Sequence, residues 1–315
     1  MLKELKFVQG AVAKKDLLPA MTHFCIEDGH VRGYNGKMAI SSPIPFEINC
    51  NPKADQLVKA ITQCEETVTL SMTEGARLRI QSGKFRAFVE TVEGDVPHPL
   101  PNGEDVMFDG EMFLEACKIL YDFIGNDASR PWTNGMLFMD QSVFATNNVC
   151  LIEYWLGAPF PHTINVPRDC IREVIRVNEP PTHAQYDEGS ITFHYDNGRW
   201  IRSQLLEITW PDVTKILDVE SAPKNIPEGF FDGVEALYRL AESKIYIVNG
   251  MLKTHLEDFT GGVYEFDNLD FEGCYNIEML GLLKDVVTTA DFSKYPEPCL
   301  FFGDRLRGAI VGIRM

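Results

Sequence analysis

The stretches VRGYNGKMAI at residues 31–40 and VFATNNVCLI at residues 143–152 are two versions of one segment. They share a valine, an asparagine and an isoleucine, and one offset of about 112 residues relates all three pairs. The pairs are Val31 with Val143, Asn35 with Asn147 and Ile40 with Ile152. A match at a fixed offset indicates that the chain contains a repeated structural unit.

The alignment continues outside this segment, with a slightly larger offset that small loop insertions explain. The further pairs are Pro19 with Pro131, Pro52-Lys53 with Pro167-Arg168, Gly75 with Gly189, and Pro97 with Pro211. A fainter third copy is KIYIVNGMLKTHL at 244–256, which resembles HFCIEDGHVRG at 23–33. Two successive offsets of roughly 110 residues predict three units.

Stretches rich in proline and polar residues separate these units. PHPLPNGED at 97–105 and VESAPKNIPEG at 219–229 are typical of linkers. We therefore predict three domains, comprising residues 1–102, 103–218 and 219–315.

Each unit is predicted to form a helix, a hairpin, a further extended run, a second helix and a second antiparallel run. Apolar spacing predicts first helices over 1–14, 110–125 and 230–242, and second helices over 52–64, 167–177 and 276–287. Alternating apolar and polar residues predict the strands, and the last hairpin turns near Gly303-Asp304. The result is an α+β fold whose neighbouring sheets could join into a ring or an arc.

The composition is that of a globular protein, with 315 residues of which 45% are hydrophobic. No run approaches the roughly 18 apolar residues of a membrane span, so we expect a cytoplasmic protein with no membrane partner. The eight cysteines are scattered singly, which predicts buried reduced thiols, no metal site and no cofactor. The net charge of −17 argues against a protein that coats nucleic acid over its whole surface, but it permits a local basic track.

Some basic residues are placed to form such a track. Three arginines are spaced at i, i+4 and i+8 in the predicted helix 167–177, so we expect one stripe that contacts phosphates. Two lysines and an arginine precede the repeated proline in the first and second units, so equivalent loops each carry a cation. The predicted nucleic-acid contacts are Lys14, Lys15, Arg130, Arg168, Arg172 and Arg176.

No familiar catalytic pattern is present. There is no GxxxxGK[ST], HExxH or GxSxG motif, and the seven histidines are dispersed, so we expect no catalytic residues. Two alternatives stay open. Asp267 and Asp270 could serve a metal-dependent nucleic-acid enzyme, or the chain could be a structural or virion assembly protein whose oligomer grows beyond two subunits.

The middle unit resembles the second domain of the bacterial β sliding clamp, the DNA polymerase III beta subunit. The segments that carry the resemblance are SRPWTNGMLF (129–138), VFATNN (143–148), NVPRDCIREVI (165–175) and ITWPDVTKIL (208–217). The first unit, from LLPAMTHFCIEDGHV to VEGDVPHP, is similar to that family's first domain, and GAIVGIRM at 308–315 to its closing strand. The third unit is shorter than is usual for the family, which suggests a phage-type version.

This resemblance implies a role in DNA replication without catalysis. It implies a homodimeric ring of six similar domains, with helices inside and sheets outside, that encircles double-stranded DNA of any sequence. Such a ring is a processivity factor that tethers a replicative polymerase, and a separate clamp loader ATPase opens it. Head-to-tail closure would join residues 84–89 to the third unit near Arg239.

The resemblance also implies site residues. The positions that match DNA contacts of the family are Lys15, Arg130, Arg168 and Arg176. A partner-peptide pocket, an apolar groove with a basic edge, would take a short linear motif of the polymerase. Its residues would be Thr133, Thr146, Leu151, Pro211, Lys215, Ile216, Val311, Ile313 and Arg314.

Overall fold

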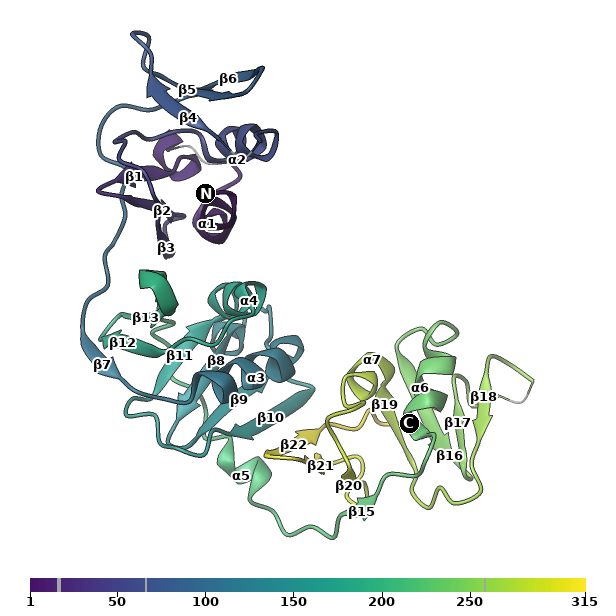
Figure 1. The fold of residues 1–315 in the computed structure, drawn as a ribbon. Coiled ribbons are helices and arrows are strands. Elements are labelled where there is room, and N and C mark those ends of the chain that lie inside the picture. The colour runs from purple at the N-terminus through teal and green to yellow at the C-terminus, as the bar shows by residue number, and fades with distance from the viewer. Residues whose placement is uncertain (16–17, 66, 258) are drawn as a thin grey trace. The chain divides into compact units, whose positions relative to one another are not determined.

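The computed structural model describes residues 1–15, 18–65, 67–257 and 259–315. The chain divides into two compact units (Figure 1). Unit 1 comprises residues 1–115 and 169–206, and unit 2 comprises residues 116–168 and 207–315.

Unit 1 contains two antiparallel sheets. Its helices are α1 (Leu2–Val8), α2 (Ala54–Thr62), the first part of α3 (Gly110–Leu120) and all but the first residue of α4 (Arg168–Val177). Its strands are β1 (Cys25–Glu27), β2 (His30–Tyr34), β3 (Met38–Pro43), β4 (Thr69–Met72), β5 (Arg77–Ser82), β6 (Phe85–Glu90), β7 (Glu104–Val106), β12 (His183–Asp187), β13 (Ser190–His194) and β14 (Trp200–Gln204). The sheet orders are β1-β2-β3-β14-β13-β12-β7 and β4-β5-β6.

Unit 2 also contains two antiparallel sheets, and its helices α6 and α7 lie side by side (Figure 1). Its complete helices are α5 (Thr214–Leu217), α6 (Phe230–Tyr238) and α7 (Ile277–Gly281). Its strands are β8 (Gly135–Met139), β9 (Ser142–Thr146), β10 (Cys150–Trp155), β11 (Ile164–Pro167), β15 (Lys224–Asn225), β16 (Lys244–Val248), β17 (Met251–Lys253), β18 (Val263–Glu265), β19 (Gly273–Asn276), β20 (Thr289–Asp291), β21 (Cys299–Gly303) and β22 (Leu306–Ile310). The sheet orders are β11-β8-β9-β10-β22-β21-β20-β15 and β18-β17-β16-β19.

The shared asparagine of the repeated segment makes the same turn twice. Asn35 Oδ1 accepts from the N–H groups of Lys37 at 3.1 Å and Met38 at 2.9 Å, between β2 and β3. Asn147 Oδ1 accepts from those of Val149 at 3.1 Å and Cys150 at 2.9 Å, between β9 and β10. A short amide side chain that satisfies two backbone donors stabilises a tight turn. The repeat is thus a repeated turn between paired strands.

Other matched positions also adopt the same local structure. Asp28 and Asn249 both have positive φ, of 50° and 51°, and each precedes a glycine with positive φ in a two-residue hairpin. This backbone is the hairpin turn that Asp-Gly and Asn-Gly favour. Pro19 and Pro131 each begin a 3₁₀ turn. The third copy, the faintest in sequence, is confirmed at this turn.

All six predicted helices exist, but most end early. α1 stops at Val8 and continues only as a 3₁₀ turn, and α7 stops at Gly281 instead of reaching residue 287. The second difference has a local cause: Asp285 has φ of 66°, which a right-handed helix cannot contain. Apolar spacing predicts where a helix lies, but not the backbone that ends it.

The expectation that sheets of neighbouring repeats join is confirmed within each unit. In unit 1, β3 pairs antiparallel with β14, and Ile40 lies opposite Ile201. In unit 2, β10 pairs antiparallel with β22 over five residue pairs, from Cys150 opposite Ile310 to Tyr154 opposite Leu306. These pairings cross the predicted linkers, so strands far apart in sequence share one sheet.

The prediction of buried thiols is confirmed for six of the eight cysteines, whereas Cys50 and Cys64 are only partly buried, and all eight are free. Burial raises the pKa of the Cys150 thiol to about 12, and it does the same for Cys170. Within the described residues, no helix has both the length and the apolar character to cross a membrane.

Arg176 on α4 holds the end of α1 in unit 1. Its guanidinium donates to the carbonyls of Lys6 at 3.0 Å and Phe7 at 2.7 Å, at the C-terminal end of α1. It also pairs at 2.5 Å with Glu173, whose side chain is only 6% exposed. A Cβ at Gly10 would lie 1.8 Å from the Glu173 carboxylate, so only glycine fits beside this pair. Arg176 is therefore a structural residue, whatever else it does.

Replacing Arg176 should destabilise the fold. Arg176→Ala leaves the buried Glu173 carboxylate with only the more distant Arg172, at 3.8 Å, and the two carbonyls without a donor. We therefore expect the free energy of unfolding to fall by about 2–4 kcal/mol. Lys59→Ala is the control, because its partner Asp55 is exposed and such pairs contribute about 0.5 kcal/mol or less. Urea denaturation followed by circular dichroism measures both. Equal effects of the two variants would contradict this role.

Candidate nucleic-acid interface and peptide groove

The two predicted cationic loops are exposed and equivalent. Lys14 and Lys15 lie just before the 3₁₀ turn that begins at Pro19, and Arg130 just before the one at Pro131. Among the described residues, none of the three has an ion-pair partner within 4 Å. Their charges are therefore available to a polyanion.

The predicted arginine stripe on α4 has the expected spacing along the helix, but the three side chains do not all point to solvent. All three arginines lie on one helix, as predicted. However, Arg168 donates to the Ile124 carbonyl at 3.0 Å and lies over the Tyr121 ring at 4.8 Å. Arg176 donates to carbonyls at the end of α1. The Arg172 side chain is 54% exposed and pairs with Asp169 at 2.9 Å. The stripe thus contains one solvent-facing guanidinium and two that bond to backbone carbonyls.

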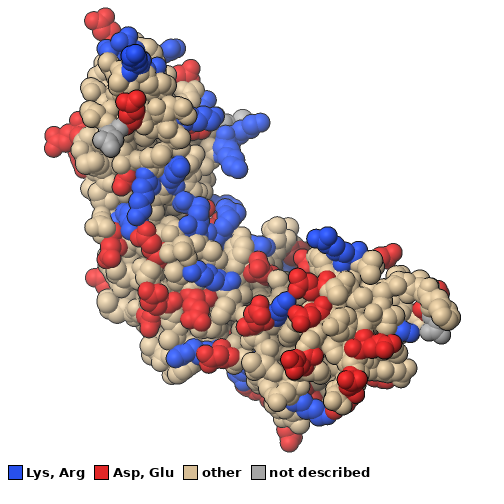
Figure 2. All heavy atoms as spheres, turned by 45° about the vertical axis from the view of Figure 1, so that its right-hand side comes forward, with Lys and Arg blue, Asp and Glu red and all other residues tan. Residues whose placement is uncertain are grey.

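Several other helix cations are already paired. Lys284 lies 2.7 Å from Glu235 and 3.5 Å from Asp232 on α6, and these carboxylates raise its pKa. Lys3 lies 3.5 Å from Glu179. Figure 2 shows Lys and Arg side chains close together on part of the drawn face, with acidic side chains numerous elsewhere on it. Positive charge is local, as the acidic composition requires.

The predicted peptide groove has a wall of two buried threonines in unit 2. Thr133 Oγ1 donates to the Arg130 carbonyl at 2.9 Å, and Thr146 Oγ1 donates to the Cys150 carbonyl at 2.7 Å. The Gly125 N–H bridges them, 2.9 Å from Thr133 O and 3.1 Å from Thr146 O. Because their donors are used locally, both threonines shape the wall and do not present a free O–H.

The floor and edge of the groove come from β10 and the segment around α5. Leu151 lies opposite Thr146 and packs in a buried cluster with Val213 and Leu217. The same segment exposes Pro211, the 39%-exposed Ile216 and the Lys215 ammonium, which is 3.1 Å from Asp212. This matches an apolar surface with a basic edge.

The C-terminal residues of the predicted groove divide into two groups. The Val311 N–H donates to the Val149 carbonyl at 2.9 Å, and the Val311 side chain is 41% exposed beside β10. The Ile313 N–H instead donates to the Cys274 carbonyl at 2.7 Å, which ties this residue to β19. Arg314 is exposed. The structure brings Val311 to the groove and holds Ile313 by its backbone against the neighbouring sheet.

Sequence reasoning missed an aromatic pair beside the groove. The rings of Trp132 and Trp210 meet edge to face at 5.2 Å, and Trp210 packs against the cluster that contains Leu151. The signal was present, since these residues directly precede Thr133 and Pro211 in the sequence. Tryptophans of this kind provide large amphipathic contact area.

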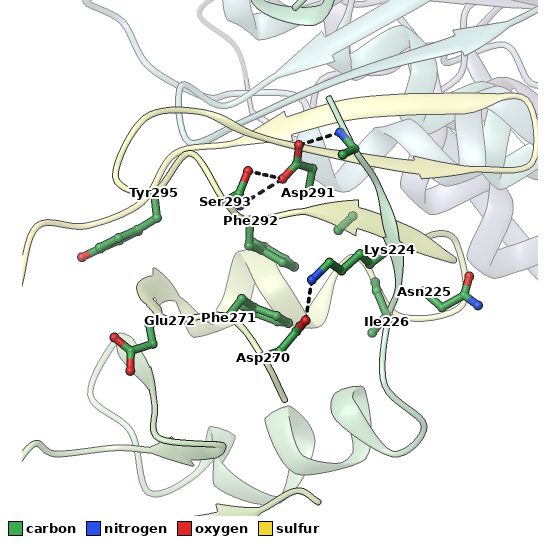
Figure 3. A pocket seen from close by; sticks show the side chains of 12 residues that line it. Lys224, Asn225, Ile226, Asp270, Phe271, Glu272, Asp291, Phe292, Ser293 and Tyr295 are labelled. Atoms are coloured by element: carbon green, nitrogen blue, oxygen red, sulfur yellow. Dashed lines mark hydrogen bonds and ion pairs between the residues drawn. The ribbon is translucent and has the colours of Figure 1, made fainter. Parts of the chain in front are cut away.

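A separate cavity of about 390 Å³ also lies in unit 2 (Figure 3). The Phe271 and Phe292 rings stack at 4.3 Å along it, and the Lys224 ammonium pairs with the Asp270 carboxylate at its edge. Buried Asp291 accepts from the Ala222 N–H at 2.9 Å, which holds the segment that carries Lys224. Of these residues, Asp270 alone was considered from the sequence, as half of the carboxylate pair in the nuclease alternative.

The geometry does not favour the nuclease alternative. Lys224 pairs with Asp270 and lowers its pKa, so that carboxylate is already neutralised. Asp267 is exposed. Across the described part of the chain, the one group of three or more metal-ligating side chains lies elsewhere, in unit 1. Asp267 and Asp270 therefore lack the further ligands that metal-assisted hydrolysis needs.

No family model and no curated protein matches the sequence. Solved structures, in contrast, match its whole length. The sliding clamp of Bartonella birtlesii bound to griselimycin has a TM-score of 0.86 at 17% identity, with 100% of this chain and 97% of that chain covered. The Bacillus subtilis clamp gives 0.85 at 16% identity with the same coverage. The Helicobacter pylori β clamp bound to a DNA ligase peptide gives 0.83 at 15% identity, covering 99% and 97%.

At such identities the similarity establishes the fold. The expected α+β architecture is confirmed, because the compared clamps align over nearly all of both chains. This chain therefore has the fold of the bacterial DNA polymerase III beta sliding clamps.

Proposed function

We propose that the chain is a DNA polymerase processivity factor, which closes as a homodimeric ring around duplex DNA. The observation that carries the proposal is the way successive repeats join. β3 of the first repeat pairs with β14 of the second, and β10 of the second pairs with β22 of the third, antiparallel both times. The same two strand positions are used at both junctions.

If a junction between two copies of the chain uses the same strand positions, it joins β18 of one copy to β6 of the other. β18 occupies in the third repeat the position of β3 and β10, and β6 occupies in the first repeat the position of β14 and β22. Both are edge strands of their sheets. An exposed edge strand invites another strand, so a second copy can pair head to tail, and two copies with six repeats can close a ring. In this proposal the repeats are domains over 1–102, 103–218 and 219–315.

The two edges are chemically matched. Phe88 on β6 is 51% exposed, and Val263 on β18 is 48% exposed. Lys84 and Arg86 precede Phe88 in sequence and Glu90 follows it, while Glu265 follows Val263. An apolar contact between the two strands, with basic residues on one strand and an acidic residue on the other, suits a specific association. We therefore propose that the ring closes through residues 84–89, the region named from the sequence, and through β18 beside α6.

A charge on either edge should open the ring. We expect the native protein to sediment at twice the subunit mass of 35.6 kDa, and Phe88→Glu or Val263→Glu to raise the dimer Kd at least about tenfold. Met72→Glu is the matched control, because Met72 is 42% exposed on β4 at the opposite edge of the same sheet as β6. Sedimentation velocity separates these outcomes. A native monomer, or equal dissociation of the Met72 variant, would refute the pairing.

We propose that the exposed cations touch phosphates without reading sequence. Lys14, Lys15, Arg130 and Arg172 would donate directly, whereas Arg168 and Arg176 would contribute charge while bonded to carbonyls. Such contacts are individually weak and sensitive to salt. Weak contacts allow a closed ring to slide.

Removing the loop cations should therefore weaken DNA binding uniformly. Replacing Lys14, Lys15 and Arg130 by Ala should lower affinity for short linear duplexes of any sequence, and reduce the slope of log K against log salt by up to about 2–3. Fluorescence anisotropy at several salt concentrations measures this. The control carries Ala at three exposed cations outside these loops, Lys37, Arg77 and Lys244. Equal losses in both variants would show that only total charge matters.

The groove around Leu151 is proposed to tether the polymerase through a short linear motif. Its apolar floor, tryptophan pair and basic edge suit a peptide with apolar anchors and an acidic residue. We propose that a clamp loader ATPase opens the ring in the cytoplasm, and that it can use the same groove.

A charge in the proposed groove should weaken peptide binding. Peptides selected on the native protein from a random library should bind Ile216→Asp and Val311→Asp at least about tenfold more weakly, because each variant places a charge on an apolar contact. Leu100→Asp is the control, since Leu100 is 55% exposed in unit 1. Isothermal titration calorimetry measures the affinities. Selected peptides that bind all three variants like the native protein would place the motif site elsewhere.

A further inference from the structure

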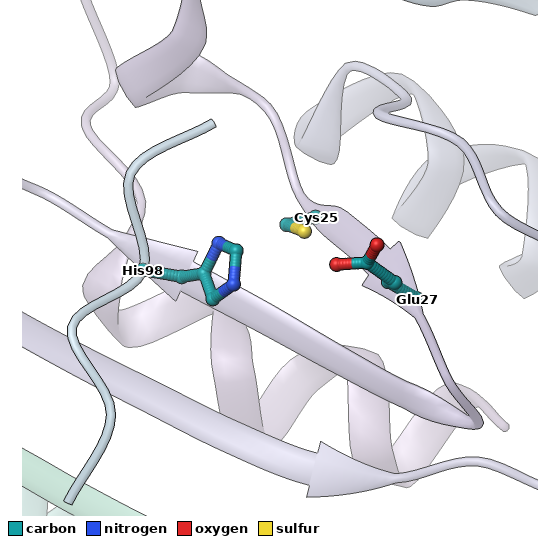
Figure 4. Close-up of side chains that lie close together, drawn as sticks. All are labelled: Cys25, Glu27 and His98. Atoms are coloured by element: carbon teal, nitrogen blue, oxygen red, sulfur yellow. The ribbon is translucent and has the colours of Figure 1, made fainter. Parts of the chain in front are cut away.

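Three side chains with different metal-binding atoms meet in unit 1. A thiol, a carboxylate and an imidazole place one ligand atom each within 4.8 Å of one another (Figure 4). Cys25 and Glu27 come from β1, where alternate residues share a face, and His98 comes from the segment between β6 and β7. The three residues show no metal-ligand spacing in the sequence, because His98 is far from the other two along the chain.

The imidazole is oriented for coordination. Its Nδ1 lies 2.7 Å from the Val96 carbonyl, which can only accept, so Nδ1 carries the proton and Nε2 has a free lone pair. Metal-ligating histidines in proteins commonly donate their other N–H to a backbone carbonyl in this way. Val96 itself is 3% exposed, so this segment is anchored in the core of unit 1.

The surroundings of the thiol are mixed in charge. Burial raises the pKa of Cys25, and Glu27 and Asp95 act in the same direction, while Arg32 on β2 opposes them. A metal ion that binds a cysteine takes the place of the thiol proton as the partner of the sulfur.

We propose that Cys25, Glu27 and His98 bind a divalent metal ion of the zinc type. Zinc accepts sulfur, nitrogen and oxygen donors in tetrahedral sites, whereas calcium and magnesium take oxygen donors. A tetrahedral site separates its ligand atoms by about 3.3–3.8 Å, so the three groups need only small movements to coordinate, and water completes the shell.

Coordination would fasten the first linker to the first sheet. His98 lies in the predicted linker 97–105, and Cys25 and Glu27 lie on the outermost strand of the seven-stranded sheet. A metal ion at this point would restrict the connection that leads to β7. The inference does not depend on DNA binding or ring closure.

Cobalt(II) provides the direct test, because a thiolate ligand gives a charge-transfer band in the near ultraviolet. The chelator-treated full-length protein should bind one Co²⁺ per chain with this band, and Zn²⁺ should displace it. Cys25→Ser should abolish the band, and Glu27→Gln and His98→Gln should each weaken binding at least about tenfold. The Glu27 side chain is exposed, so its replacement tests the site without threatening the fold.

His30→Gln is the matched control. His30 also bonds through Nδ1 to the backbone carbonyl two residues before it, at 2.9 Å from Asp28 O, but it lies outside the cluster. Zinc at about 100 times its Kd should also raise the Tm of the native protein and of the His30 variant by about 5 °C, and leave the Cys25 variant unchanged. No thiolate band, a band that survives Cys25→Ser, or equal weakening in His30→Gln would overturn the proposal.

Discussion

Backbone pairing between strands of successive repeats is the interaction on which the rest of the structure depends. An edge strand presents unpaired N–H and C=O groups, and these repeats satisfy them with one another. At the β10–β22 junction the Arg307 guanidinium reinforces the pairing, 2.5 Å from Glu153 across the strands and 2.8 Å from Asp218. A Cβ at Gly308 would lie 2.3 Å from the Phe301 ring, so the junction is closely packed. The surface around Leu151 that we propose as a peptide groove depends on β22 being held beside β10.

The proposed ring explains how an acidic chain can hold DNA. Residues 1–102 carry twelve basic and twelve acidic residues, so the whole net charge of −17 resides in residues 103–315. A protein that held DNA by attraction alone would need an excess of positive charge. Enclosure removes that requirement, since a closed ring retains a duplex even when each contact is weak. In the proposed ring, the exposed cations at Lys14, Lys15 and Arg130 would centre the DNA.

Local chemistry made much of the fold predictable. Asn35 and Asn147 are conspicuous because their side chains make turns that few residues can make, and Asp28-Gly29 has a counterpart at Asn249-Gly250 for the same reason. The positions of the helices followed from apolar spacing. Long-range contacts were not predictable: the carbonyls that bind Arg168 and Arg176, the Trp132–Trp210 pair and the approach of His98 to Cys25 all depend on the tertiary fold.

The central claim is retention of DNA by topology, and one measurement tests it directly. Subunits are separated by dilution, mixed with nicked circular plasmid and concentrated, so that rings close around the DNA without a loader. After gel filtration in moderate salt, a single-site restriction enzyme linearises half of the sample. The account predicts that protein stays with the circular plasmid and leaves the linear one. Equal release from both forms, or equal retention on both, would contradict it.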